Sequence, residues 1–195
     1  RSCLRAALDR DTGLRAGRLF THVAVYEIPG FDRLLIISDG GVVVAPDIYQ
    51  KIEIVQNSIE VAHRLGIETP KVAILAASEF VSPKIPSTVD AANLSKMAER
   101  GQIRGALVDG PLALDNAISE EAARIKKING PVAGHADILI VPDIEAGNML
   151  AKGLTYFAHG EMAGIVVGGT APIVVASRSD SHKTKLVSLA LGVLF

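Results

Sequence analysis

The chain is poor in several features that mark particular classes of protein. Its 195 residues include one cysteine, Cys3, no tryptophan and only 4% aromatic side chains. A single cysteine cannot form an internal disulfide, so we expect a reducing, cytoplasmic location. Neither sign of charge is in excess, because 20 basic side chains stand against 21 acidic ones. A nucleic-acid binder needs a surplus of Lys and Arg, so we expect no nucleic-acid partner.

Long hydrophobic runs are also missing, although 49% of the residues are hydrophobic. A membrane-spanning helix needs about 20 consecutive apolar residues. The best apolar stretch, 163–176, is shorter and is interrupted by Gly168, Gly169 and Pro172. The N-terminus has no apolar signal-peptide region behind its charges. We therefore expect no membrane partner, while the apolar content is ample for a folded core.

Standard cofactor and metal motifs are absent as well. The sequence contains neither GxGxxG nor GxxxxGK[ST], so neither a dinucleotide fingerprint nor a P-loop is supported. The histidines have no paired ligand spacing, and one cysteine gives no zinc site. We expect no metal, and we interpret His135 and His159 as surface or packing residues.

What the sequence does contain is an alternation of short Val/Ile-rich runs with amphipathic segments. The runs predict strands near 22–28, 34–38, 72–76, 105–108, 137–141, 164–168 and 172–176. The amphipathic segments predict helices near 47–65, 88–100, 118–127, 145–158 and 182–192. Uniformly apolar strands between helices favour an α/β fold with a mostly parallel sheet covered by helices on both faces. The turn signal at residues 29–32 predicts a hairpin between the first two strands, so the sheet is expected to be mixed.

Polar residues follow the strand at 137–141. Asp143 stands where a helix N-cap belongs, and Glu145, Asn148 and Lys152 lie on one face of the following helix. Because ligands of open α/β sheets bind at the carboxyl ends of strands, this stripe can orient a phosphate or a carbonyl group. A capped helix with a solvated face also explains these residues, and taken alone it is the slightly preferred interpretation.

A second strand, at 172–176, delivers Ser177 and Arg178 to the start of a helix. The backbone N–H groups there favour an anion, and the guanidinium of Arg178 can bind phosphate with two parallel hydrogen bonds. A capping segment through residues 179–181 is the plain alternative. A third cluster follows the strand at 105–108, where Asp109 and Gly110 read mostly as turn chemistry, and Ser78 lies at an equivalent edge.

Five segments carry a family resemblance in matching order along nearly the whole chain. They are LRAALDRDTGLRAGR (4–18), HVAVYEIPGFDRLLIISDGG (22–41), VDGPLALDNAIS (108–119), ADILIVPDIEAGNMLAKGLTYFA (136–158) and PIVVASRSDSHKTKL (172–186). Together these segments resemble the phosphate acetyl/butyryltransferase family, with the butyryltransferase branch the nearer.

The resemblance implies a fold like that of isocitrate and isopropylmalate dehydrogenases, with two α/β lobes and an active site between them. Residues 17–169 then form the second lobe, while 1–16 and 170–195 belong to an incomplete first lobe. It also implies transfer of an acyl group between coenzyme A, used as a substrate, and inorganic phosphate. Because the C-terminal segment LVSLALGVLF is very apolar, we expect a homodimer or larger assembly.

The resemblance further assigns roles by motif position. Ser177 and Arg178 match the catalytic Ser-Arg pair, in which the Arg would hold phosphate and the Ser would donate to the coenzyme A sulfur. Arg5 matches another arginine of the cleft. The residues expected to line the substrate site are Ser78, Asp109, Gly110, Asp143, Asn148 and Lys152.

One position departs from the acetyl branch, which carries an aspartate base six residues after the arginine. Here that residue is Thr184, so no general base can be assigned from the sequence. A non-catalytic module that binds acyl-CoA or phosphate, or supports assembly, therefore remains an alternative. A metal- and nicotinamide-dependent dehydrogenase of the same fold is a weaker one, because the chain lacks an Asp pair at metal-ligand spacing.

Overall fold

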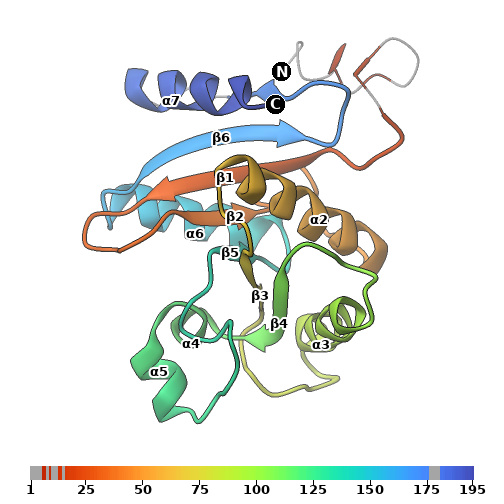
Figure 1. Ribbon diagram of the computed structural model, residues 1–195, viewed down its shortest axis with the longest axis vertical. Coiled ribbons are helices and arrows are strands. Elements are labelled where there is room, and N and C mark those ends of the chain that lie inside the picture. Colours follow the sequence, from red (N-terminus) through yellow and green to blue (C-terminus); the bar gives the residue numbers. More distant parts are fainter. Residues whose placement is uncertain (1–5, 8, 10–12, 15, 176–180) are drawn as a thin grey trace.

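A computed structural model of the chain describes residues 6, 7, 9, 13, 14, 16–175 and 181–195. Its centre is one seven-stranded sheet in the order β4-β3-β5-β2-β1-β6-β7 (Figure 1). The strands are β1 (Thr21–Glu27), β2 (Leu35–Ser38), β3 (Lys71–Leu75), β4 (Leu107–Leu112), β5 (Ile138–Ile140), β6 (Glu161–Val167) and β7 (Ile173–Val174). The neighbours β2, β5, β3 and β4 pair in parallel, whereas β1 and β7 pair antiparallel with their neighbours. The predicted mixed sheet is confirmed.

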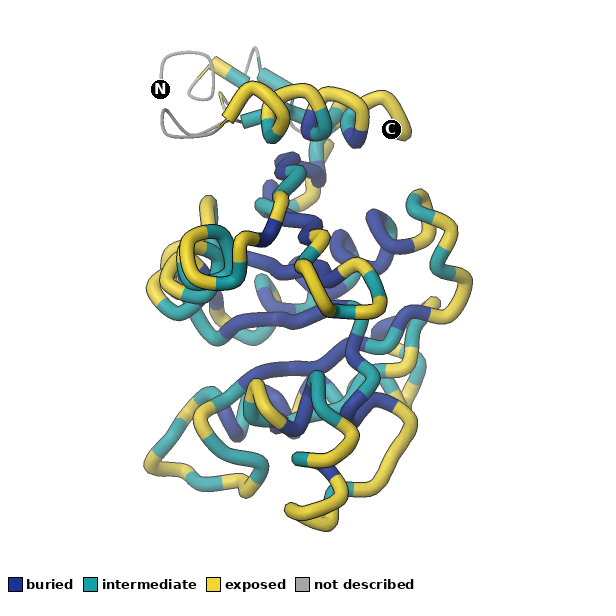
Figure 2. The backbone as a smooth tube through the Cα atoms, turned by 90° about the vertical axis from the view of Figure 1, so that its left-hand side faces the viewer, coloured by how far each residue is buried: buried dark blue, intermediate teal, exposed yellow. Residues whose placement is uncertain are grey.

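Helices cover both faces of the sheet, as the sequence predicts. They are α2 (Ile48–Arg64), α3 (Pro86–Glu99), α4 (Leu114–Ile118), α5 (Glu120–Ile125), α6 (Ile144–Tyr156) and α7 (His182–Val193). Side chains of α2, α3 and the end of α7 share one buried cluster with one sheet face. Side chains of α4, α5 and α6 share another cluster with the opposite face. Figure 2 shows the buried strands between the more exposed helices.

Alternation along the strands explains why both faces are apolar. In β2, Ile36 points into the cluster beneath α2, and Leu35 and Ile37 point into the cluster beneath α6. All three are at most 2% exposed. A strand buried on both faces needs a continuous apolar run, which is the pattern that identified it in the sequence.

The hairpin between β1 and β2 forms where the turn signal predicts it. The Phe31 N–H donates to the Ile28 carbonyl at 3.0 Å, and Gly30 adopts a φ of +81°, which glycine reaches at little cost. This hairpin places β1 antiparallel beside β2. The long antiparallel pairing of β1 with β6 then extends the sheet toward α7.

Three predicted elements differ from the structure. The helix expected at 118–127 is two short helices, because Ser119 is extended and caps α5 by accepting the Ala122 N–H at 3.3 Å. The strand expected at 105–108 runs from 107 to 112, so Asp109 and Gly110 lie within a strand instead of in a turn. A proline is tolerated there because β4 is an edge strand, where the missing N–H breaks no ladder. The strand expected at 172–176 is only two residues long.

Candidate active site

A cavity of about 480 Å³ opens between α6, the start of α7, the loop after β2 and one face of strands β1 and β6. Polar and charged side chains line part of it: His22, Asn148, Lys152, Thr155, Glu161, Ser181, Lys183 and Thr184. Apolar side chains line the rest: Val42, Ala151, Met162, Val166, Val175 and Val187. A concave, largely apolar space with a few convergent polar groups is the usual form of a small-molecule site.

The register between β1 and β6 builds the cavity floor. His22 pairs with Val166 and Tyr26 pairs with Met162, and all four side chains line the cavity. The pair between them on the same face is Ala24 with Gly164. Because this middle pair is small, the floor is lower there than at either end.

The loop after β2 forms the wall nearest the carboxyl edge of the sheet. Asp39 is 2% exposed, and its carboxylate accepts hydrogen bonds from the backbone N–H groups of Gly41 and Val42, each at 2.8 Å, and of Val43 at 3.3 Å. It also accepts the His22 N–H at 2.9 Å. A buried carboxylate with four backbone donors is fully used as an acceptor, so Asp39 organises the wall and is not available to a ligand.

Helix α6 approaches this loop at backbone distance through two glycines. A β-carbon on Gly147 would lie 2.8 Å from the Gly40 Cα and 2.7 Å from Val141 Cγ2. The contact brings the Asn148 amide to 3.4 Å from the Gly40 carbonyl. The GN pair of the sequence thus has a physical basis, in that the glycine permits the approach and the asparagine follows it at the cavity wall.

The middle of α6 is held by Tyr26, which is fully buried. Its hydroxyl donates to the Ala151 carbonyl at 3.0 Å and lies 3.4 Å from the Thr155 hydroxyl. This bond fixes the turn of α6 that carries Lys152 against the floor of the cavity.

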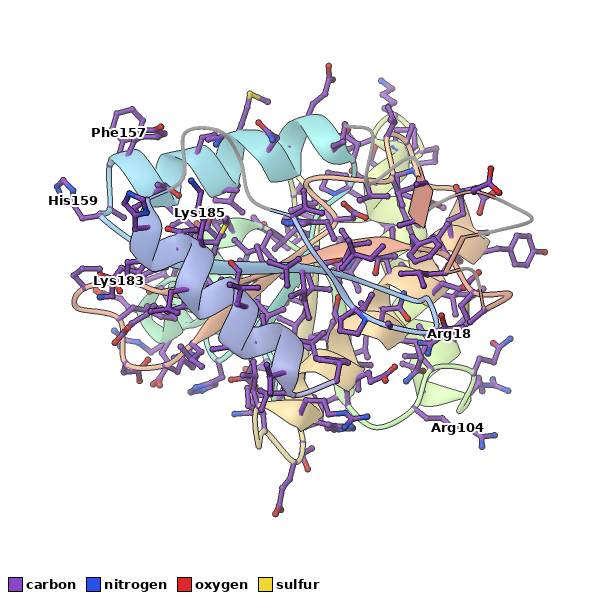
Figure 3. The ribbon with its side chains drawn as sticks, turned by 90° about the horizontal axis from the view of Figure 1, so that it is seen from above. Arg18, Arg104, Phe157, His159, Lys183 and Lys185 are labelled. Atoms are coloured by element: carbon purple, nitrogen blue, oxygen red, sulfur yellow. The ribbon has the colours of Figure 1, made fainter. Side chains whose placement is uncertain are left out.

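The opposite wall is the first half of α7. Ser181 caps this helix by accepting the Thr184 N–H at 3.0 Å, so the predicted capping role is confirmed for Ser181. One turn after Thr184, the Ser188 hydroxyl accepts the Gly164 N–H at 2.9 Å and attaches α7 to β6. Figure 3 shows Lys183 and Lys185 at the start of α7, at the same end of the molecule as Phe157 and His159, which follow α6.

An ion pair crosses the rim of the cavity. The Lys183 ammonium lies 2.5 Å from the Glu161 carboxylate, and both side chains are partly exposed. This hydrogen bond raises the pKa of Lys183 above its ordinary value. Lys183 therefore remains a cation across the physiological range, although its charge is already shared with Glu161.

The structure brings two of the predicted site residues to the cavity, Asn148 and Lys152. Asp143 is the N-cap of α6, as expected, and its carboxylate accepts the Ala146 N–H at 2.8 Å. Asp143 does not line the cavity, so its described contacts are those of a helix cap.

The other predicted residues lie elsewhere or outside the described ranges. The Ser78 hydroxyl accepts the Phe80 N–H at 3.1 Å in the loop after β3, and neither Ser78 nor Asp109 nor Gly110 lines the cavity. In β4, Gly110 packs so closely on Ile74 that a β-carbon would lie 2.9 Å from the Ile74 Cβ. Arg5, Ser177 and Arg178 fall on residues that the structure does not describe.

Sequence reasoning missed His22 and the two glycines at 40 and 41. His22 begins the apolar run HVAVYEI, on the face that also carries Ala24 and Tyr26, and a polar ring on that face was the available signal. Its distance of more than one hundred residues from α6 hid the proximity of the two.

Two features are absent from the described ranges: a cluster of metal-ligating side chains and a membrane-spanning helix. Among these residues no group of three or more His, Cys, Asp or Glu side chains is placed to hold a metal. None of the helices described is long and apolar enough to cross a bilayer.

The fold and the cavity define an α/β protein with a small-molecule site beside the carboxyl end of a buried strand. Comparison with known sequences identifies the protein family. The chain belongs to the family described as phosphate acetyl/butaryl transferase, which matches residues 1–193. The family resemblance of the sequence is thereby confirmed.

Individual relatives agree with this membership. The chain is 54% identical over 191 residues to a phosphate butyryltransferase of Clostridium acetobutylicum, covering 98% of the chain and 64% of that protein. It is 55% identical over 184 residues to a phosphate acetyltransferase of Rhizobium meliloti, covering 94% and 58%. The chain thus spans less than two thirds of the length of these relatives.

A solved structure has the same fold. The crystal structure of a branched-chain phosphotransacylase from Enterococcus faecalis V583 is 41% identical and superimposes with a TM-score of 0.88. The match covers 98% of this chain and 68% of that one.

Proposed function

We propose that this chain transfers a short acyl group between coenzyme A and inorganic phosphate, giving an acyl phosphate. The observation that carries the proposal is the position of Asn148 and Lys152 on one wall of the cavity. These are the residues that the family resemblance assigns to the substrate site, and they come from the segment with the clearest resemblance.

The ends of the Ser-Arg segment support the same proposal. Val175 and Ser181 both line the cavity, and Ser177 and Arg178 lie between them in the sequence. By family resemblance, Arg178 holds the phosphate, Arg5 belongs to the same cleft, and the Ser177 hydroxyl donates to the coenzyme A sulfur.

The reaction requires little beyond positioning and charge stabilisation. A phosphate oxygen attacks the thioester carbonyl, and the tetrahedral intermediate expels the thiolate. Alignment of the two reactants can supply on the order of 7–11 kcal/mol of the barrier reduction. Lys152 offers an ammonium and Asn148 an amide to the oxygen atoms on which charge develops.

The finer architecture and assembly belong to the same proposal. Residues 17–169 form the second lobe of a dehydrogenase-like pair, and 1–16 with 170–195 belong to the first. The protein acts in the cytoplasm as a homodimer or larger assembly and uses no metal. The exposed apolar side chains of α7, Leu186, Leu189 and Val193, support burial of this helix in a larger assembly.

The first experiment follows free thiol from butyryl-CoA with and without phosphate. We expect phosphate-dependent thiol release, which Arg178→Ala abolishes while the far-UV circular dichroism stays unchanged. Release that does not depend on phosphate, or full activity of Arg178→Ala, would overturn the proposal. Binding of butyryl-CoA without release would favour the non-catalytic module.

A variant within the described cavity complements this assay. Lys152→Ala should lower kcat/KM for phosphate by about 10–100-fold, the range expected for one lost charge-assisted hydrogen bond. Lys84→Ala is the matched control, since Lys84 is exposed and does not line the cavity. Equal activity of the two variants would remove Lys152 from the site.

A further inference from the structure

His22 is the one imidazole among the described side chains that line the cavity. It is the second residue of β1. In the sequence it is far from the two segments that contain the Ser-Arg pair and the α6 motif. Its ring is half-buried, and it lies on the floor opposite α6 and next to the loop after β2.

The backbone of His22 is fixed from two sides. Its N–H donates to the Asp39 carboxylate at 2.9 Å, and its carbonyl accepts the Ser38 hydroxyl at 2.8 Å. Both partners are at most 2% exposed. The residue therefore has a defined position that does not depend on the ring itself.

Two glycines make room for the ring. A β-carbon on Gly41 would lie 2.9 Å from the His22 Cγ, and one on Gly164 would lie 3.0 Å from the His22 Nε2. A β-carbon at position 41 would require a shift near the imidazole, and one at position 164 would crowd its Nε2 edge. The chain thus omits side chains from two separate elements at the place where this ring reaches the cavity.

Several charged and titratable groups face the cavity with His22. They are Tyr26 on β1, Lys152 and Tyr156 on α6, Glu161 on β6 and Lys183 on α7; Asp39, in the loop after β2, contacts the backbone N–H of His22. Glu161 and Lys183 pair with each other, and Asp39 is occupied by backbone donors. Imidazole is the side chain whose ordinary pKa lies near neutrality, so it can both take and give a proton at physiological pH.

From this geometry we propose that His22 is the acid–base catalyst of the acyl transfer, an inference that rests on the proposed function. The neutral imidazole takes the proton of hydrogenphosphate as a phosphate oxygen bonds to the thioester carbonyl carbon. The C–S bond then breaks, its electron pair leaves on sulfur, and the imidazolium gives the proton to the thiolate. A free thiol has an ordinary pKa of about 8.5, so this protonation favours the product at neutral pH. In the reverse direction His22 deprotonates the coenzyme A thiol.

The test compares His22→Asn with His159→Asn. His159 is an exposed histidine outside the cavity lining with a φ of +53°, which asparagine also tolerates. We expect His22→Asn to lower kcat/KM by about 100-fold or more, the usual contribution of a general acid–base group, and His159→Asn to leave it unchanged. At a constant concentration of hydrogenphosphate, the wild type should lose rate as the pH falls, and this loss should be absent in His22→Asn.

Chemical rescue separates catalysis from packing. Added imidazole should restore part of the rate of His22→Ala and should not accelerate the wild type. His22→Gln provides a second variant of similar size if His22→Asn does not fold, as judged by thermal unfolding. Folded variants that keep the wild-type rate and pH profile would overturn the role of His22. A wild type without phosphate-dependent thiol release would instead overturn the proposed function.

Discussion

The two ends of the sheet's carboxyl edge use their polar side chains differently. At the cavity end, which comprises the loop 39–43 and α6, the buried carboxylate of Asp39 is satisfied by backbone N–H groups, and glycines let the backbones touch. The side chains of His22, Asn148 and Lys152 consequently face the cavity.

At the β3 end, which comprises residues 78–79 and helices α4 and α5, the polar side chains bond to one another. Glu79 accepts hydrogen bonds from Asn116 and from Lys126, each at 3.3 Å, and Lys126 also lies 3.0 Å from Asp115. One oxygen, Asn116 Oδ1, is buried there without a hydrogen-bond partner among the described residues. A polar side chain at the end of a strand is therefore not enough to make a binding site. It must also face a cavity instead of bonding to other side chains of the protein.

Among changes that test this difference between the two ends, Asp39→Asn should have the largest effect on stability. The new amide presents an NH₂ group to backbone N–H donors, so at least one of the four hydrogen bonds is lost in a buried place. We expect a loss of unfolding free energy on the order of 2–4 kcal/mol in urea denaturation. Asp47→Asn is the control, because Asp47 is an exposed N-cap of α2 and asparagine caps equally well. Similar losses in both variants would contradict the organising role of Asp39.

The next largest effect is expected from Gly147→Ala, compared with Gly153→Ala on the same helix. The first β-carbon meets the Gly40 backbone, whereas the second has no neighbour within 4 Å. We expect Gly147→Ala to cost about 1–3 kcal/mol and to lower turnover by moving α6 away from the loop. Gly153→Ala should stabilise the chain by up to about 1 kcal/mol, since alanine is the better helix former. Thermal unfolding and the thiol assay distinguish the two, and equal results would show that α6 does not need the close contact.

Asp143 offers a smaller but more specific test of the cavity end. If its carboxylate acts as the cap of α6, Asp143→Asn should change stability by less than about 0.5 kcal/mol, and Asp143→Ala should cost about 1 kcal/mol. Activity of Asp143→Asn should stay near that of the wild type. A folded Asp143→Asn with strongly reduced turnover would instead return this carboxylate to the substrate site.

Most of the fold could be predicted from the sequence because its buried strands are continuous apolar runs. Residues 35–38 of the run at 34–38 are buried on both faces, and the turn residues before the run specify the hairpin. The prediction failed where a single residue determines the limits of a helix or strand. Ser119 ends a helix by capping the next one, and Pro111 continues a strand only because that strand lies at the edge. Lys51 of α2 is buried, and its ammonium pairs with Asp90 of α3 at 2.7 Å, a contact between two helices that no pattern along α2 contains.

The candidate site could be predicted only along single segments. Asn148 and Lys152 share a helical face, a relation that local spacing reveals. His22 joins them through the antiparallel register of β1 and β6 and the loop after β2, which no local pattern contains. Ser78 follows a strand and Asp109 lies in one, but no local pattern reveals that the cavity forms at the other end of the sheet's carboxyl edge.

The smallest expected effect concerns the β3 end and its dependence on pH. The hydrogen bond from Lys126 lowers the pKa of Asp115 below its ordinary value. A carboxyl group with a lowered folded-state pKa stabilises the fold above its unfolded pKa and loses that contribution as the pH falls through the folded value. Asp115→Asn should therefore be slightly less stable than the wild type at pH 7, and the difference in Tm should vanish in acid, below the lowered pKa of Asp115. Glu68→Gln, which replaces an exposed carboxylate with no ion pair among the described residues, should show no such convergence.

Because Asp115 does not line the cavity, turnover at pH 7 should be the same in the wild type, Asp115→Asn and Glu68→Gln. A change in turnover would mean that the two ends of the edge are coupled.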